Sequence, residues 1–189
     1  LFLGLKRKCF FCFALILFAS QPCISQTTKV DKLLPQLNQK LQDTSRLRIL
    51  RELTAAYSSV DQDKKFYYAK RYKKLSEKLK IDTLVVEALI DMGGSHAIQS
   101  KMDSALHYFS KGQEMAKAIS YQGGIARSLA SIGYVYDKLD RKKESIEVYS
   151  KALGIYRKIK NRKGINQCLI NIGGIYYDLT EYELAQNYL

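Results

Sequence analysis

One eight-residue pattern recurs three times in this chain of 189 residues: LIDMGGSH at 89–96, LASIGYVY at 129–136 and LINIGGIY at 169–176. The three copies start forty residues apart, and small and large residues further along the chain keep the same register. A fixed period of this length is typical of stacked units, each too small to bury its own apolar face and stabilised by its neighbours. The sequence therefore predicts a repeat architecture.

The spacing inside each unit predicts two helices. Counted from the recurrent glycine, positions −4, −1 and +3 lie on one face of a helix with 3.6 residues per turn, and positions +12, +16 and +19 lie on one face of a second helix. We expect the glycine to mark a close crossing of the two helices, because a bulkier side chain would push their backbones apart. The residues predicted to pack the repeats are Leu89, Gly93, Ala105, Phe109, Leu129, Gly133, Tyr136, Tyr149, Ala152, Leu169, Gly173, Tyr176 and Ala185.

The position between the two helices of each unit also recurs, as Ser100, Asp140 and Thr180. Side chains of these types accept a hydrogen bond from a free backbone amide at the start of a helix, so we predict that they are the N-caps of the second helices. Asp103 and Glu183 follow three residues after the first and the third, which is the spacing of a capping box.

The pattern resembles the tetratricopeptide repeat family, whose order is a large apolar residue, a leucine-like residue with glycine, an aromatic residue, alanine, a large aromatic residue and alanine. The middle unit departs from this order only at Ser145 and otherwise matches at Leu129, Ile132-Gly133, Tyr136, Tyr149 and Ala152. The usual period is about 34 residues, so the longer period resembles the long-helix branch, which includes kinesin light chains and bacterial peptide-sensing regulators. The resemblance implies an all-α, right-handed superhelical stack of helical hairpins.

The start of the chain has a different composition. Lys6, Arg7 and Lys8 precede a short apolar run and a segment of small residues, an order typical of a cleaved secretory signal peptide, with a retained signal anchor as the alternative. We therefore expect an exported protein, periplasmic or in the cell envelope, with tethering through a downstream transmembrane helix as one arrangement. The predicted units are a signal peptide at 1–25, a lead-in capping helix at 26–42, a degenerate hairpin at 43–82, and repeats at 83–122, 123–162 and 163–189, the last truncated.

No catalytic, cofactor-binding or metal-binding residue is predicted in this segment. His96 stands in an aromatic packing column, and neither it nor His107 has a second ligand at metal spacing. No glycine pair is followed by the lysine and hydroxyl residue of a phosphate-binding loop. The other three cysteines lie in the leader, so no disulfide framework is expected. Cys168 stands one residue before Leu169 on the first helix of the third unit and is predicted to be a buried, inert thiol; the alternative is a reactive one.

The formal net charge of +13 favours anionic partners, although no nucleic-acid partner is expected for this segment. The densest basic segment flanks an apolar helical stripe. It indicates either a solvated outer face whose aliphatic stems cover the core or a docking surface for an anionic partner such as the cell envelope. The basic residues of this segment are Lys64, Lys65, Lys70, Arg71, Lys73, Lys74, Lys78 and Lys80.

The first helices of such a stack line its concave side, and their side chains that do not pack point into the groove. These positions carry Glu87, Asp91, Gly94 and Ile98, then Arg127, Ser131, Tyr134 and Lys138, and then Gln167, Asn171, Gly174 and Asp178. Mixed hydrogen-bonding side chains suit an extended peptide, whose backbone offers a donor and an acceptor at each residue. We predict a peptide groove formed by Arg127, Ser131, Tyr134, Lys138, Gln167, Asn171 and Asp178; the alternative is that these residues only solvate a concave face.

The family resemblance implies that Asn171 holds the ligand backbone, whereas Asp91 and Ser131 stand at the equivalent positions and leave no full asparagine ladder. It also implies a function in recognition. The leading hypothesis is the exported sensory or scaffolding part of a bacterial signal-transduction protein, with a histidine kinase or a DNA-binding regulator downstream. The alternatives are a free-standing cell-envelope scaffold for complex assembly and a non-catalytic segment of an enzyme whose active domain lies downstream. The ligand, the oligomeric state and the total repeat number stay open.

Overall fold

The computed structural model describes the backbone of residues 21–188 and the side chains of residues 29–188. Within that range the chain consists of helices joined by short turns, without a strand. The predicted signal peptide lies mostly outside the described residues. The elements are α2 (Gln21–Leu37), α3 (Asp43–Ala56), a 3-10 turn (Tyr57–Ser59), α4 (Gln62–Lys78), α5 (Asp82–Ile98), α6 (Met102–Ala118), α7 (Gln122–Lys138), α8 (Lys142–Lys158), α9 (Arg162–Asp178) and α10 (Tyr182–Gln186).

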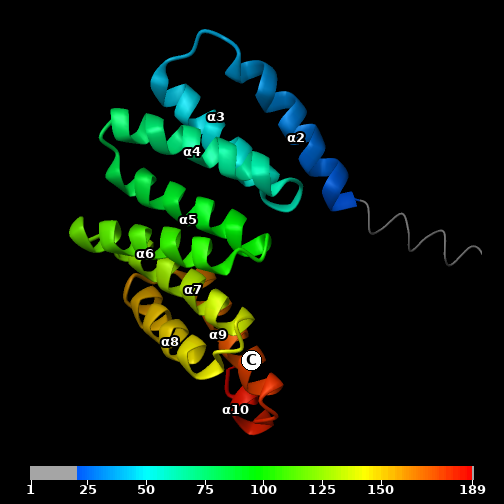
Figure 1. Cartoon of the computed structure of the whole chain (residues 1–189), viewed down its shortest axis with the longest axis vertical. Helices are drawn as coiled ribbons and strands as arrows, with labels where there is room; N and C mark the ends of the chain where they lie inside the picture. Colours follow the sequence, from blue (N-terminus) through cyan, green and yellow to red (C-terminus); the bar gives the residue numbers. More distant parts are fainter. Residues whose placement is uncertain (1–20, 189) are drawn as a thin grey trace, which may run out of the picture.

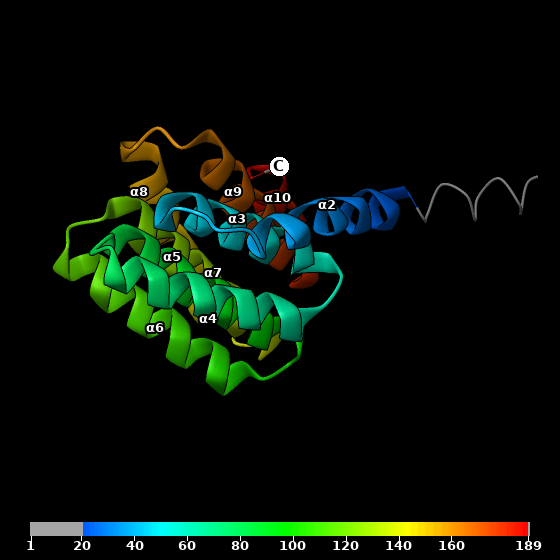
Figure 2. The same ribbon diagram turned by 90° about the horizontal axis from the view of Figure 1, so that it is seen from above.

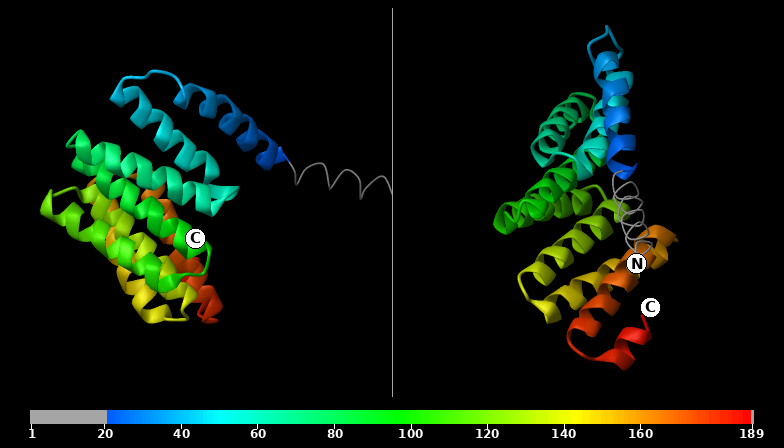
Figure 3. Two further views of the ribbon diagram at one scale, coloured as in Figure 1. Left: turned by 45° about the horizontal axis from the view of Figure 1, so that its top comes forward. Right: turned by 90° about the vertical axis from the view of Figure 1, so that its right-hand side faces the viewer.

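The hairpins follow one another in single file, from α2 and α3 at one end to α10 at the other (Figure 1, Figure 3). Each helix packs mainly on the helices before and after it in the sequence. Three clusters of buried apolar residues succeed one another along the stack, around Leu53, Phe109 and Tyr149. The fold is therefore an α-solenoid of helical hairpins, in which each interface between neighbours contributes to the stability of the whole.

A turn of one geometry ends every helix from α4 to α9. Its central residue has a positive φ of 55° to 62°, and this residue recurs every twenty positions, at Lys80, Ser100, Ser120, Asp140, Lys160 and Thr180. The next amide bonds back into the helix, as from Lys101 N–H to the His96 carbonyl oxygen at 2.9 Å, which closes the C-terminal end of a helix. Each forty-residue unit is thus two half-units, each a helix of 17 residues and a turn.

The prediction that Ser100, Asp140 and Thr180 cap the second helices is wrong. These residues adopt the left-handed conformation after the first helix of each unit. The N-cap positions of α6, α8 and α10 are the following residues, Lys101, Arg141 and Glu181, and none has a side-chain capping bond. The capping boxes predicted with Asp103 and Glu183 are therefore not formed.

The predicted close crossing is confirmed at Gly93 and Gly133. A Cβ atom at Gly93 would lie 2.6 Å from the ring of Phe109, and one at Gly133 would lie 2.9 Å from the ring of Tyr149. The hydroxyl of Ser145 also donates a hydrogen bond to the Gly133 carbonyl oxygen at 2.7 Å. The glycine is needed because the large aromatic residue sixteen positions later covers it.

The residues predicted to pack the repeats lie in the interior. All of them are buried except Tyr136, Leu169 and Tyr176, which are partly buried against the same clusters. His96 packs between aromatic rings as predicted, 5.4 Å from Tyr108 and 4.9 Å from Phe66 between ring centroids. Burial lowers its pKa, which favours the neutral ring. The prediction that Cys168 is buried is confirmed, since its side chain has no exposed surface.

The N-terminal end of the stack is less regular than the rest. The lead-in helix α2 begins earlier than the predicted residue 26 and stops at Leu37, so Leu41 lies in the following turn. Val30 and Leu33 bury its apolar face in the first core cluster. Thr54 occupies the place of the recurrent glycine in α3, and its hydroxyl donates to the Leu50 carbonyl oxygen at 2.8 Å. The shorter α3 and its 3-10 turn give this hairpin a different shape from the later ones.

Candidate binding groove

The first helices of the hairpins lie on the inner side of the stack. Viewed from above, α5 and α7 are central, and α4 and α6 lie outside them (Figure 2). The first helix α7 contacts the first helices α5 and α9 of the neighbouring hairpins directly. Among the described residues, the second helices α4, α6 and α8 make fewer contacts with one another than these first helices do. A stack that is tighter on one side curves toward that side, so the first helices line its inner face.

A hollow of about 540 Å³ opens on this face. Its walls come from α5, α7 and α9, and its floor is formed by aromatic residues of the second helices: Phe109, Tyr149 and Tyr156. A neighbouring hollow of about 320 Å³ shares Tyr134, Tyr149 and Asn171 with it. Together the two hollows form a continuous groove, called here the inner groove, along α7 and α9.

All seven residues predicted to form a peptide groove line the inner groove. The larger hollow contains Arg127, Ser131, Tyr134, Gln167 and Asn171, and the smaller one contains Tyr134, Lys138, Asn171 and Asp178. Gly94 and Ile98 of α5 line the larger hollow and Gly174 the smaller one. Ligand binding by these residues stays a prediction, since their position in the groove is a matter of geometry only.

Glu87 and Asp91 of α5 are held in ion pairs. Arg127 of α7 pairs with both, through Nη1 to Glu87 and through Nη2 to Asp91 Oδ1 at 2.6 Å. The hydroxyl of Tyr121 donates to Glu87 at 2.9 Å, and that of Tyr72 donates to Asp91 at 3.2 Å. This network joins two consecutive first helices and satisfies both carboxylates. Arg127 therefore has a structural role besides lining the groove.

Burial dominates the electrostatics of this network. It raises the pKa of Asp91 to about 6, against the opposing effects of Lys65 and of the Tyr72 hydrogen bond. It also lowers the pKa of the Arg127 guanidinium and raises the pKa of Tyr72. The cations of Arg127 and Lys65 lie near the carboxylates of Glu87 and Asp91, so this part of the inner groove carries little net charge.

The far end of the inner groove is neutralised in the same way. Lys142 of α8 donates to Asp137 at 2.7 Å and to Asp178 at 3.3 Å. Lys138 lies over the ring of Tyr134, 5.5 Å from its centroid. Between the charged ends, the Gln167 amide donates to Asn171 Oδ1 at 3.1 Å. The middle of the groove thus presents neutral amide and hydroxyl groups above an aromatic floor.

Lys65 does not belong to the exposed basic segment in which it was predicted. Its side chain is buried. Burial lowers the pKa of its ammonium group, and the nearby charge of Asp91 only partly opposes this effect. The Nζ atom lies 3.2 Å from the position that a Cβ atom of Gly94 would occupy. The forty-residue repeat could have predicted the burial of Lys65. Lys65 falls in the column of the small residues Ala105, Ser145 and Ala185, which is an interior position.

Sequence reasoning also missed Tyr72, Tyr121, Asp137 and Lys142 as partners of the groove. The ring of Tyr72 is buried, and its hydroxyl reaches Asp91. The other three belong to α7, α8 and the turn before α7. The spacing of residues in the sequence does not specify how these elements are rotated relative to α5 and α9. Only the packing of neighbouring helices brings these side chains together.

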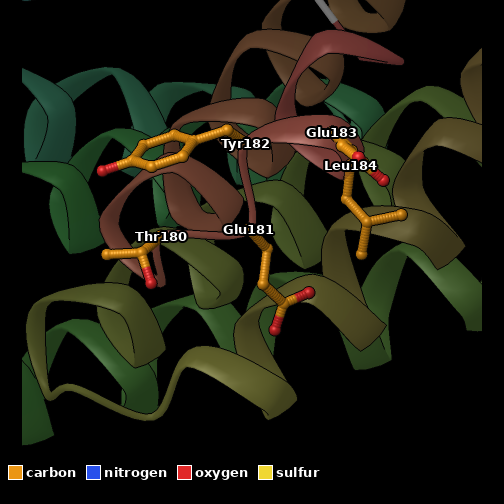
Figure 4. A pocket seen from close by; sticks show the side chains of 5 residues that line it. All are labelled: Thr180, Glu181, Tyr182, Glu183 and Leu184. Carbon is orange, nitrogen blue, oxygen red and sulfur yellow. The ribbon is translucent and has the colours of Figure 1, made fainter.

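A separate hollow of about 420 Å³ lies at the turn between α9 and α10 (Figure 4). It is lined by five consecutive residues, from Thr180 to Leu184. Their side chains point in different directions around one turn, and no polar group from another element joins them. Within the described residues no cluster of His, Cys, Asp and Glu is arranged to hold a metal ion. The inner groove is therefore the better candidate site.

The sequence profile described as tetratricopeptide repeat matches residues 126–159, which span most of α7 and α8. The fold of the chain is tetratricopeptide-like, and one of its repeats matches the family model. No curated protein sequence matches it.

Solved structures similar to this repeat protein share its architecture at low sequence identity. A Rap protein complexed with Competence and Sporulation Factor has 15% identity and a TM-score of 0.77, with 90% of this chain and 49% of that one covered. PlcR of Bacillus thuringiensis in complex with the peptide PapR7 and DNA has 15% identity and a TM-score of 0.67, with 97% and 68% covered. A putative kinesin light chain of Podosopora anserina has 12% identity and a TM-score of 0.60, with 92% and 88% covered. The chain thus spans about half the length of the Rap protein.

Proposed function

We propose that the repeat protein binds an extended peptide or protein segment in the inner groove. The observation that carries this proposal is the larger hollow, where neutral hydrogen-bonding side chains surround an aromatic floor. An extended segment needs both features, because its backbone must exchange hydrogen bonds with water for hydrogen bonds with protein while an apolar side chain is buried.

The amides of Gln167 and Asn171 are the groups best suited to the ligand backbone. They stand one helical turn apart on α9, and each amide offers both a donor and an acceptor. The rings of Tyr149 and Tyr156 below them would receive an apolar side chain of the ligand. Because the charged groups of the groove are paired with one another, the ligand segment is expected to be largely uncharged, with binding that depends little on salt.

The similar structures support this proposal. The Rap protein is complexed with Competence and Sporulation Factor, and PlcR is complexed with the peptide PapR7 and DNA. A signal transduction ATPase of Pyrococcus horikoshii with a tetratricopeptide repeat sensor is also similar, at 20% identity and a TM-score of 0.64. Several proteins of this architecture thus combine a repeat array with a sensing or peptide-bound state.

The test is a binding measurement with matched variants. Peptides selected from a random display library on the wild-type chain would be labelled, and their Kd measured by fluorescence anisotropy. Gln167→Ala/Asn171→Ala should raise the Kd at least tenfold, whereas Asn166→Ala, at an exposed position of the same helix outside the groove, should leave it unchanged. Equal affinities for the two variants would refute binding in the inner groove.

We further propose that the chain is the exported sensory or scaffolding part of a signal-transduction protein. The leader-like composition of residues 1–25 supports export. Within the described residues, no helix has the length and apolar content that a membrane span requires. A fusion of residues 1–45 to alkaline phosphatase, which is active only after export, tests the proposal. An inactive fusion that accumulates in the cytoplasm would contradict it.

A further inference from the structure

A second groove lies on the opposite, outer face of the stack, between the second helices α4 and α6. This outer groove has a volume of about 680 Å³, and its floor is formed by Leu89 and Met92 of α5. The space follows from the curvature of the stack, because helices that converge on the inner side are separated on the outer side. The outer groove shares no lining residue with the inner groove.

The walls of the outer groove are strongly basic. Helix α4 contributes Lys70, Arg71, Lys73 and Lys74, and α6 contributes Lys111. The one acidic residue in the lining, Glu77, is already paired with Lys73. In the described part of the chain, no ion pair neutralises Lys70, Lys74 or Lys111. Unpaired cations around a buried apolar floor concentrate positive potential there.

Aromatic residues and a neighbouring hollow extend this surface. The Arg71 guanidinium lies over the ring of Tyr67, 5.5 Å from its centroid, and Tyr67 is 53% exposed. A smaller hollow of about 360 Å³ between α3 and α4 shares Arg71 and Lys74 with the outer groove. It adds Arg46 and Lys78, which face the single carboxylate of Asp43. The excess of positive charge therefore continues along α4.

We propose that the outer groove is the docking site of an acidic segment of a partner protein, in which several Asp or Glu residues flank a large apolar side chain. Lys70 and Lys74 stand one helical turn apart, about 6 Å along the axis. Alternate residues of an extended chain are separated by about 6.6 Å. Carboxylates at alternate positions can therefore meet successive cations of α4, and a carboxylate on the other side meets Lys111.

The shape of the outer groove favours a protein segment over a lipid surface. The apolar floor is recessed, since Leu89 and Met92 are only 2% and 4% exposed. A bilayer is flat and can touch only the basic rims, whereas a single side chain can enter the hollow. Because the two grooves lie on opposite faces, this docking is independent of a ligand in the inner groove.

The experiment uses the whole chain and a defined probe. The probe is a fluorescein-labelled nonapeptide with glutamate at alternate positions and phenylalanine at its centre, compared with the same peptide carrying glutamine for glutamate. The variant is Lys70→Glu/Lys74→Glu/Lys111→Glu. Its control, Lys143→Glu/Lys158→Glu/Lys163→Glu, changes the net charge equally at exposed lysines outside both grooves. Circular dichroism melting checks that both variants fold.

We expect the acidic peptide to bind the wild type and the control variant, with a Kd at least tenfold higher for the outer-groove variant. The affinity should also fall steeply between 20 and 200 mM salt, and replacement of the central phenylalanine by alanine should weaken binding. If the outer-groove variant melts early, Lys70→Gln/Lys74→Gln/Lys111→Gln replaces it. Equal Kd values for the two charge-reversal variants would overturn the proposal. So would phosphatidylglycerol vesicles that bind the wild type but not the outer-groove variant, together with no measurable binding of the acidic peptide. Peptide binding lost in Gln167→Ala/Asn171→Ala would move the site to the inner groove and also overturn it.

Discussion

The guanidinium of Arg127 on α7 donates a hydrogen bond to Asp91 on α5, with Nη2 and Oδ1 2.6 Å apart. The two residues are 36 positions apart in the sequence and belong to consecutive hairpins. Their pair therefore fixes the distance between two neighbouring first helices at the edge of the inner groove. Because Glu87 shares the same guanidinium, one side chain holds two carboxylates together.

Replacing Arg127 should lower the stability of the array. In Arg127→Ala the carboxylates of Glu87 and Asp91 are left close together with little solvent around them, so we expect a loss of about 1–3 kcal/mol in the free energy of unfolding. Urea unfolding followed by circular dichroism measures it. Arg157→Ala, at an exposed position on α8, is the control and should stay within about 0.5 kcal/mol of the wild type. An equal, small effect of both changes would show that the network is not structural.

The protonation of Asp91 should make the stability depend on pH. Its pKa is about 6 in the folded chain against the ordinary value of 3.8. The folded chain thus keeps a proton that the unfolded chain releases, so the contribution of this group to stability is complete below pH 4 and is lost as the pH rises through 6. Urea unfolding at pH 4, 5, 6 and 7 would measure it. Asp91→Asn should abolish this part of the profile, and an unaltered profile would contradict the assignment.

Two glycines of the same protein should respond oppositely to alanine. A Cβ at Gly133 would lie 2.9 Å from the buried ring of Tyr149, whereas a Cβ at Gly154 meets nothing within 4 Å. Gly154→Ala should stabilise the chain by about 1 kcal/mol through helix propensity alone. Gly133→Ala should be destabilising, because the steric cost exceeds that gain. Thermal melting of both variants decides the point, and a rise in Tm for Gly133→Ala would contradict the tight crossing.

The turns that recur every twenty residues carry non-glycine residues in the left-handed conformation. Lys160 has a φ of 55°, which costs an L-residue about 1–2 kcal/mol. Lys160→Gly relieves this cost and should raise the free energy of unfolding by about 0.5 kcal/mol, after the larger entropy of glycine in the unfolded chain is subtracted. Lys158→Gly, at the last residue of α8, should instead lower the free energy of unfolding by up to about 1 kcal/mol. The same sign for both changes in urea unfolding would exclude the proposed strain.

Cys168 should resist alkylation in the folded chain. Its thiol is fully buried, and burial raises its pKa to about 11, so almost no thiolate is present or accessible at pH 8. Iodoacetamide labelling followed by peptide mapping should find Cys168 unmodified in buffer and modified in 6 M urea. Labelling in buffer at the rate of a free thiol would contradict this burial.

The parts of the fold that the sequence predicted are those with a periodic signal. The recurrence of Gly93 and Gly133 with large residues sixteen positions later predicted both the hairpins and their close crossing, because that geometry requires a small residue. The turns were misassigned, since Ser100 and Asp140 have the side chains of N-caps, and the left-handed conformation has no mark in residues such as Lys80 or Lys160. Glycine at these positions would have revealed it.

The groove was predictable in position but not in its electrostatics. Helical spacing alone put Arg127 and Asn171 on the inner face. The spacing could not show that Arg127 pairs with two carboxylates of the preceding hairpin, because this depends on how α5 and α7 are rotated against each other. Lys65 was grouped with exposed lysines by its charge, although its register position is an interior one.

The equal length of the helices and turns from α4 to α9 makes the array modular. Excising the forty residues from 123 to 162 would join the end of α6 to α9 through a turn of the geometry already present there. A single inserted residue would instead turn every following side chain of its helix by about 100° and bury the wrong face. Duplication or deletion of whole forty-residue units can therefore lengthen or shorten such a protein with its packing preserved, whereas smaller insertions in its helices would disrupt that packing.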